Sequence, residues 1–218
     1  MLELPLFPLN TVLFPSTPLQ LHIFEERYKK MIAHCRKAGS TFGVVLIQHG
    51  QEAHGPLPAP RTVGCTAQIA KVQPREQGKM DLVVLGQERF RILALQQDHP
   101  YLVGIVELIE LNVDDAPKLT EQAKILRGWV ERYLRVLGEG VEGLESALLM
   151  LPNEPLNLAY LAATSLQINL DQKQALLEID NAPLLFNTLI TTYRREIALA
   201  KKIMSTPTSP SESPFSRN

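Results

Sequence analysis

The sequence predicts an α+β protein with a β-rich N-terminal part and a helical C-terminal part. Up to residue 114, short segments rich in β-branched and aromatic residues alternate with Gly, Pro and Asp clusters, a pattern typical of successive strands. Beyond it, apolar residues recur at intervals of three and four, which is typical of amphipathic helices. We therefore expect a β-rich subdomain over residues 1–114, a helical subdomain over 115–204 and a disordered Ser- and Pro-rich tail over 205–218.

The N-terminal part opens with a proline-rich apolar segment, "ELPLFPLNTVLFPSTPLQLHI". Proline cannot donate to a strand ladder and is confined to edges, strand starts and bulges, so we interpret this opening as two short edge-like strands separated by a turn near "PSTP". A helix follows, with apolar residues at helical spacing from Phe24 to Cys35 and Gly39 at its end. Further strands are expected over residues 41–48, 62–73, 79–95 and 101–111.

The C-terminal part predicts four helices that pack as a bundle. The second, "EPLNLAYLAATSLQ", has Asn153 as its expected cap. The third, "DQKQALLEI", has Asp171 as its expected cap. The fourth, "APLLFNTLITTYRREIALAKKIM", is preceded by Asp180 and Asn181. The first, over residues 118–138, carries one apolar stripe made by Leu119, Ala123, Leu126, Val130, Tyr133 and Leu137.

Composition argues against several classes of protein. A net charge of -1 gives no general attraction to nucleic acids or anionic lipids. No stretch reaches the roughly 20 apolar residues that a membrane-spanning helix needs, and the early prolines together with a missing basic region argue against a signal peptide. Cys35 and Cys65 form neither a disulfide framework nor a zinc knuckle. We expect a cytoplasmic protein that binds neither nucleic acid nor membrane.

Nucleotide and hydrolase motifs are missing from the sequence. Gly50 and Gly55 have the spacing of a phosphate loop, but Pro56 and Leu57 stand where Lys and Ser or Thr are required. The sequence contains no GxSxG, HExxH or GxGxxG motif. We therefore expect no catalytic residues and no cofactor.

Isolated His and Cys residues do not form a recognisable metal site. His49 and His54 lie in a Gly- and Pro-rich loop that would not fix the geometry of a ligand pair. His22 stands between two apolar residues, a setting in which a hydrogen-bonded structural role is commoner than catalysis. Cys35 and Cys65 are expected to be small core residues. We therefore expect no bound metal.

Several separated blocks of the sequence resemble the N-terminal, substrate-binding domain of Lon proteases and its stand-alone bacterial relatives. These blocks are "LPLFPLNTVLFPSTPLQLHIFEERYKKMI", "VGCTAQIAKV", "LVVLGQERFRI" and "LAYLAATSLQINLDQKQALLEIDNAPLLFNTLITTYRREI", and the resemblance covers residues 2–200. It implies a PUA-like β pseudo-barrel followed by a helical bundle. It also implies a non-enzymatic module, because the ATPase and peptidase motifs of a full Lon protease are missing from these residues.

The resemblance implies binding of unfolded or tagged polypeptides, with a protease or chaperone as a further partner, in an adaptor or regulator of protein quality control. The alternative is an RNA-binding module, because PUA-like folds include RNA binders. The balanced charge and the lack of a basic stripe with interleaved aromatic residues speak against it. A small-molecule enzyme is a third hypothesis and would need a polar pocket. The oligomeric state stays open.

Candidate binding residues come from two blocks that match the family, "HIFE.RY" and "G.ERF.I". The alternative is an architectural role, in which Glu25 and Arg27 pair with Arg89 or other charged neighbours where helix meets sheet. In that role the aromatic members are simply core. The candidates are His22, Phe24, Glu25, Arg27, Tyr28, Gly86, Arg89 and Phe90.

Overall fold

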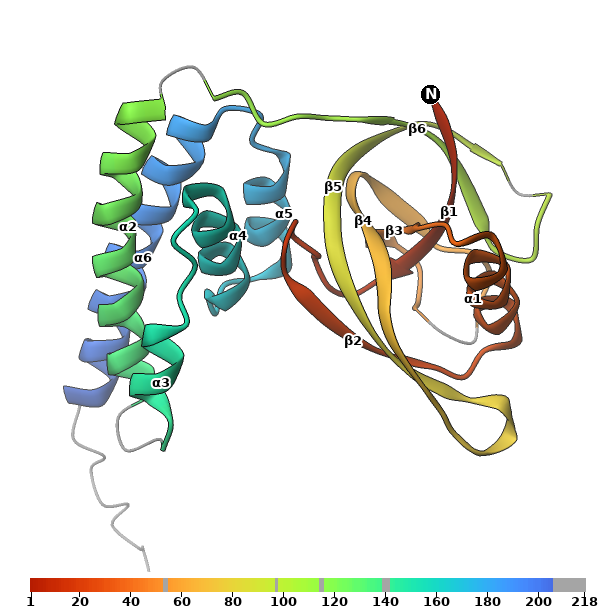
Figure 1. Cartoon of the computed structure of the whole chain (residues 1–218), viewed down its shortest axis with the longest axis horizontal. Coiled ribbons are helices and arrows are strands. Elements are labelled where there is room, and N and C mark those ends of the chain that lie inside the picture. The colour runs from red at the N-terminus through yellow and green to blue at the C-terminus, as the bar shows by residue number, and fades with distance from the viewer. Residues whose placement is uncertain (53–54, 97, 114–115, 139–141, 206–218) are drawn as a thin grey trace, which may run out of the picture.

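A computed structural model describes the chain except for residues 53–54, 97, 114–115, 139–141 and 206–218. The tail expected over 205–218 lies outside the described residues, apart from Ser205 at the end of the last helix. Strands and one helix form a barrel, and an extended segment connects it to a group of helices beside it (Figure 1). The predicted fold class, a β barrel followed by a helical bundle, is confirmed.

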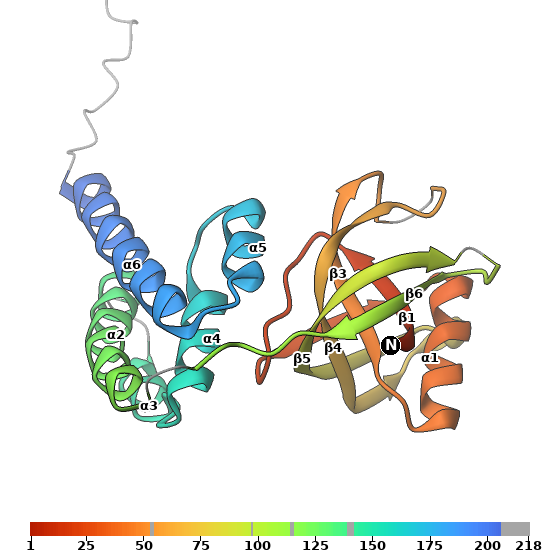
Figure 2. The ribbon, with the colours of Figure 1, turned by 90° about the horizontal axis from the view of Figure 1, so that it is seen from above.

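The barrel contains six strands in the order β2-β5-β4-β3-β1-β6, and β5 also pairs with β6. The first part of β5 pairs with β2 and its last part pairs with β6. One long strand therefore pairs with the strands at both ends of the sheet order, which closes the barrel. Helix α1 covers the side of the barrel that is remote from the other helices (Figures 1 and 2). The elements are β1 Leu2–Leu9, β2 Pro18–Ile23, α1 Glu26–Ala38, β3 Phe42–His49, β4 Ala59–Pro74, β5 Met80–Gln96 and β6 Leu102–Leu108.

The expectation of two edge strands at the N-terminus is right for β2 and wrong for β1. β1 lies between β3 and β6. Residues 2–6 pair with β6 and residues 6–9 pair with β3, so each half of the strand is bonded on one side only. This arrangement explains how an internal strand can contain Pro5 and Pro8. Each half of β1 has one unpaired side, where a missing N–H donor costs no ladder hydrogen bond.

The helical part contains one helix more than the sequence predicted. The extra helix, α3, spans only six residues and is too short to display a period. Two predicted caps are wrong by one or two positions: Glu154 caps α4 by accepting from the Asn157 N–H, and Asn169 caps α5 through a capping box with Gln172. The helices are α2 Ala116–Leu137, α3 Leu144–Leu149, α4 Pro155–Ser165, α5 Leu170–Glu178 and α6 Ala182–Ser205.

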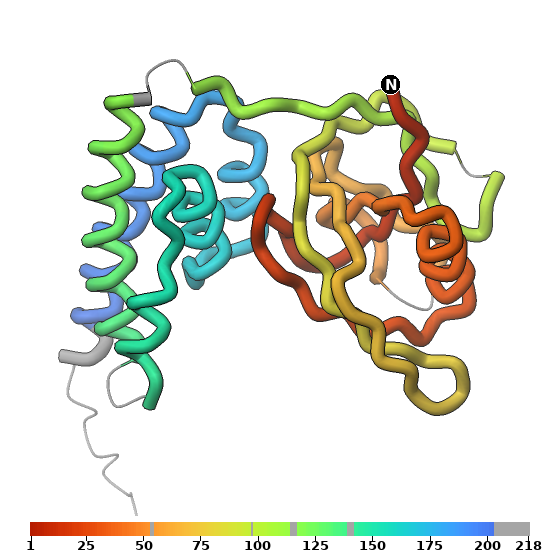
Figure 3. The backbone as a smooth tube through the Cα atoms, in the orientation of Figure 1, coloured from red at the N-terminus to blue at the C-terminus, as the bar shows by residue number. Residues whose placement is uncertain are grey.

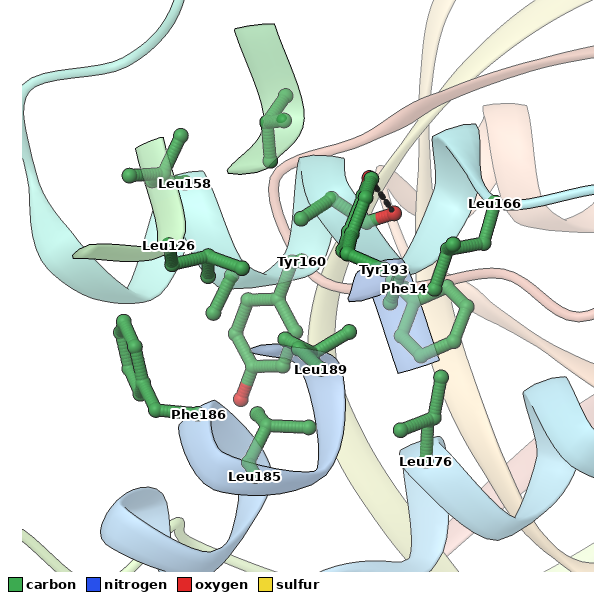
Figure 4. Packing of buried hydrophobic residues seen from close by; sticks show 14 of the residues in the cluster. Phe14, Leu126, Leu158, Tyr160, Leu166, Leu176, Leu185, Phe186, Leu189 and Tyr193 are labelled. Atoms are coloured by element: carbon green, nitrogen blue, oxygen red, sulfur yellow. Dashed lines mark hydrogen bonds between the residues drawn. The ribbon is translucent and has the colours of Figure 1, made fainter. Parts of the chain in front are cut away.

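The predicted stripe of α2 packs against α6, and its members from Leu119 to Tyr133 are buried, whereas Leu137 is 42% exposed. The Tyr133 ring meets the Tyr193 ring edge to face at 5.1 Å between centroids. The Tyr193 hydroxyl donates to the Ala162 carbonyl at 2.9 Å, which ties α6 to α4 (Figure 4). In the described residues, no helix is long and apolar enough to cross a bilayer.

The barrel and the helices share a core. The segment between β1 and β2 reaches the helices, and its Phe14 side chain lies among theirs (Figures 3 and 4). Val63 on β4 belongs to the same cluster, and the buried Gln174 side chain of α5 donates to the Val63 carbonyl at 3.0 Å. Burial of apolar surface and of satisfied polar groups therefore fixes the helices against one side of the barrel.

Candidate functional site

The eight candidate residues separate into two groups in the folded chain. The "HIFE.RY" block lies at the junction of β2 and α1, where four of its five candidate residues border a groove. The "G.ERF.I" block lies on β5, against the segment between β1 and β2, the helices and the barrel core. The structure does not bring the two blocks together: Glu25 and Arg27 pair with each other and not with Arg89, whose partners are main-chain carbonyls.

The groove has a volume of about 400 Å³ and runs along β2 from Leu19 to Ile23. Phe7 and Leu9 of β1 and Tyr28 of α1 also line it. The apolar side chains come from two segments that the sequence separates, β1 and β2 with the residue after it: Phe7, Leu9, Leu19, Leu21, Ile23 and Phe24. A concave, mainly apolar surface of this size with a few polar groups is the usual form of a binding site.

Aromatic rings give the groove its shape. The Phe7 and Tyr28 rings are 4.2 Å apart between centroids, and both residues are nearly fully buried. Phe24 is 39% exposed, and its ring stacks on the His22 ring at 5.9 Å. An exposed aromatic side chain beside a buried pair offers a contact surface at low conformational cost.

Helix α1 positions Tyr28 through its apolar stripe. Tyr28, Met31, Ile32 and Cys35 are its buried residues, and Gly39 ends the helix in a left-handed conformation at φ 63°. Burial raises the pKa of Tyr28 to about 12, so the phenol is neutral at physiological pH. The helix thereby presents an uncharged aromatic side chain to the barrel.

Charged side chains at the groove are acidic among the described residues. Glu25 forms a salt bridge with Arg27 at 2.9 Å, and Arg27 also donates to the Gly55 carbonyl at 3.3 Å. Glu52 Oε2 accepts from the Asn10 N–H at 2.9 Å and has no salt-bridge partner within the described parts of the chain. No Lys or Arg of those parts lines the groove. The local field therefore favours a cation over an anion.

Arg89, by contrast, is an architectural residue. Only 3% of it is exposed, and its guanidinium donates to three main-chain carbonyls, those of Leu177 and Glu110, each at 2.9 Å, and that of Ile179. Leu177 and Ile179 lie at the C-terminal end of α5, where a helix dipole favours a positive charge. Arg89 therefore joins β5 to α5 and to the segment that leaves β6.

Gly86 and Phe90 are also explained by packing. A Cβ atom at Gly86 would lie 2.1 Å from the Phe14 carbonyl oxygen, so only glycine fits there. The Gly86 main chain bonds both to Ser16 and to Thr17, which fixes the turn before β2. Phe90 is fully buried within the barrel. The structure favours an architectural role for the second block.

The thiols of Cys35 and Cys65 are both free and buried, as expected of core residues. Burial raises the pKa of the Cys65 thiol to about 12 and also raises that of Cys35, so neither is a reactive thiolate. Among the described residues, no group of three His, Cys, Asp or Glu side chains could hold a metal, and His54 lies outside them.

Sequence reasoning missed the contribution of Phe7, Leu9 and Glu52 to the groove. Phe7 and Leu9 alternate along β1 and are indistinguishable in the sequence from other buried strand residues. Glu52 comes from a loop that only the fold brings close to Asn10. No periodicity or motif could have identified them.

Comparison with known proteins assigns the family. The model of the ATP-dependent protease La (LON) substrate-binding domain matches residues 3–189. This chain belongs to that family. The Lon domain fold is also found in the crystal structure of a Lon N-terminal domain protein from Xanthomonas campestris, with a TM-score of 0.65, 27% identity, and coverage of 88% of this chain and 98% of that one. For the N-terminal domain of a Mycobacterium avium complex Lon protease, the TM-score is 0.63 at 18% identity, with the same coverage.

Curated Lon relatives are longer than this chain. It is 29% identical over 181 residues to Lon protease 2 of Myxococcus xanthus, a match that covers 80% of this chain and 21% of that protein. A Lon protease of Syntrophus aciditrophicus is 29% identical over 211 residues, covering 93% of this chain and 26% of that protein. The chain thus spans about a fifth to a quarter of these relatives. Membership of the Lon substrate-binding family supports a substrate-binding role.

Proposed function

We propose that this protein is a non-catalytic module that binds polypeptides through the groove beside β2. The observation that carries the proposal is the juxtaposition of an apolar groove of about 400 Å³ with a strand edge that has no second neighbour in the described chain. An exposed strand edge next to pockets for side chains is one of the recurring ways in which folded domains hold peptides. The family's substrate-binding role agrees with this use.

Such a module would act as an adaptor or regulator in protein quality control, presenting unfolded or tagged polypeptides to a protease or chaperone. The free cysteine thiols fit work in the reducing cytoplasm. The sequence motifs needed to cradle ATP phosphates or to activate a nucleophile are missing, so we infer that these 218 residues hydrolyse neither ATP nor peptides.

Binding of RNA is the less supported function. RNA binders hold phosphates with clustered Lys and Arg, whereas the charged side chains that line the groove in the described residues are Glu25 and Glu52. An anionic ligand would be repelled at this surface.

The proposal is tested by fluorescence anisotropy with labelled apolar peptides and with single-stranded RNA, each over a salt series. We expect peptide affinity near micromolar, about -8 kcal/mol, with little dependence on salt. The Phe24→Ala variant should bind peptide about tenfold more weakly because it removes an exposed aromatic anchor. Its thermal unfolding should match that of the parent.

Leu149→Ala is the matched control, since Leu149 is an 88% exposed apolar residue on α3, far from the groove in the chain's fold (Figure 1). Equal weakening by both substitutions would contradict the assignment of the groove. Submicromolar RNA binding that falls steeply with salt, without any peptide binding, would replace this function with the RNA-binding one.

A further inference from the structure

The groove follows the open edge of β2, and the direction of the main-chain groups along that edge can be derived. The Gly86 N–H donates to the Thr17 carbonyl at 3.0 Å, immediately before the first paired residues of β2 and β5. In an antiparallel ladder, bonded and non-bonded pairs alternate. Every second residue after Thr17 therefore bonds to β5, and Gln20 and His22 direct their N–H and C=O groups away from it.

A further observation agrees with this alternation. Pro18, which has no N–H, falls on the same outward side, where its missing donor costs no ladder hydrogen bond. The side chains of Gln20 and His22 are exposed, whereas those of Leu21 and Ile23 are buried. β2 thus offers two sets of outward main-chain groups beside a groove that is also lined by Phe7 and Leu9.

The rim chemistry restricts the occupant. Arg27 neutralises Glu25 at 2.9 Å, whereas Glu52 has a main-chain N–H as its partner and no cation in the described residues. A bound segment that places an ammonium or guanidinium near Glu52 gains attraction, and one that places a carboxylate there is repelled.

We propose that the groove binds an extended, apolar polypeptide segment as an additional strand on β2, and that it prefers segments carrying Lys or Arg over those carrying Asp or Glu. This inference rests on the proposed polypeptide binding and adds its geometry and its sequence preference. Main-chain hydrogen bonds to Gln20 and His22 supply affinity for any extended sequence, while the apolar lining and Glu52 supply selection.

Strand addition is tested on the whole chain with a labelled peptide of alternating Val and Thr that ends in Lys. Gln20→Pro removes an outward N–H without touching the ladder to β5, and we expect it to weaken binding about tenfold. Leu149→Ala on α3 again serves as the control and should stay within about twofold of the parent. Equal binding by the parent and Gln20→Pro would overturn strand addition.

A second measurement covers the case in which Gln20→Pro does not fold. The same peptide, N-methylated at alternate residues, keeps its side chains but loses donors, and the unaltered protein should bind it about tenfold more weakly. Undiminished binding of the methylated peptide would overturn strand addition while leaving polypeptide binding intact. No binding of either peptide would instead contradict the proposed function itself.

The charge preference is tested by exchanging the terminal Lys of the peptide for Glu. We expect the Lys peptide to bind about threefold more tightly at low salt, the range of a solvent-exposed ion pair. Glu52→Gln should abolish this difference, and Glu131→Gln on α2 should preserve it. A difference that survives Glu52→Gln, or a preference for the Glu peptide, would overturn the assignment of Glu52.

Discussion

Arg27 and Arg89 lie on opposite sides of the barrel and show how differently one residue type can be used. The Arg27 side chain is 14% exposed and balances a carboxylate beside an open groove. Arg89 is 3% exposed, and its guanidinium donates to main-chain carbonyls, which holds the helices against the barrel. The sequence blocks that match the family therefore contain both residues at a groove and residues that hold the fold together, and only burial and partners distinguish them.

The largest effect is expected from Arg89→Met, which leaves three carbonyls without their donor where β5 meets α5. We expect a loss of about 4 kcal/mol in the free energy of unfolding, because breaking a buried charged network costs that order. Chemical denaturation measures it. Arg91→Met is the control, since Arg91 on the same strand is exposed and its contact with Glu107 is long, at 3.4 Å. Equal losses would refute the special role of Arg89.

The second-largest loss in the free energy of unfolding is expected from Gly86→Ala. The new Cβ would collide with the Phe14 carbonyl, so the turn before β2 must shift, at a cost of about 3 kcal/mol. Gly128→Ala on α2 meets nothing within 4 Å and should stabilise the helix by about 1 kcal/mol. Thermal unfolding of both variants separates them. A harmless Gly86→Ala would show that this turn is free to move.

The smallest effect is expected at the outer face of β2. Asp81 contacts His22 at 2.7 Å and Arg75 at 2.6 Å, and these two partners lower the pKa of its carboxyl. A lowered folded-state pKa contributes stability above the unfolded value and loses it as the pH falls through the folded one. Asp81→Asn should thus be slightly less stable than the parent at neutral pH.

That difference should vanish in acid, below the lowered pKa of Asp81, and denaturant midpoints over a pH series measure it. Asp98→Asn is the control, because Asp98 makes no salt bridge among the described residues. A difference that persists below the lowered pKa of Asp81 would contradict the assigned pairing.

Periodicity predicted most of the elements. The stripe of α2 and the end of α1 at Gly39 follow from local rules, since burial and the left-handed cap act over a few residues. The position of β1 was wrong because proline content reports a missing donor and not which neighbour lies beside the strand. Strand order depends on contacts between distant segments, which no local pattern encodes.

The candidate site was predicted in part. His22, Phe24, Glu25 and Tyr28 border the groove, but they were selected with residues that serve the core. Gly86 and Arg89 could not be distinguished from these four residues in the sequence, because the sequence does not show which side chains are buried. The distinguishing contacts, to Phe14 and to α5, join segments far apart in the chain.

The change of partner along β1 has a consequence for the chain as it leaves the ribosome. The half of β1 that pairs with β3 can form its hydrogen bonds as soon as β3 has been synthesised. The other half pairs with β6, with Leu2 opposite Val106 and Leu4 opposite Gly104, and β6 is synthesised much later. Until β6 emerges, residues 2–6 of β1 remain an unpaired strand, a state prone to wrong association. β1 precedes the other five strands of the sheet and is nevertheless among the last to be fully paired, so barrel closure depends on the arrival of β6.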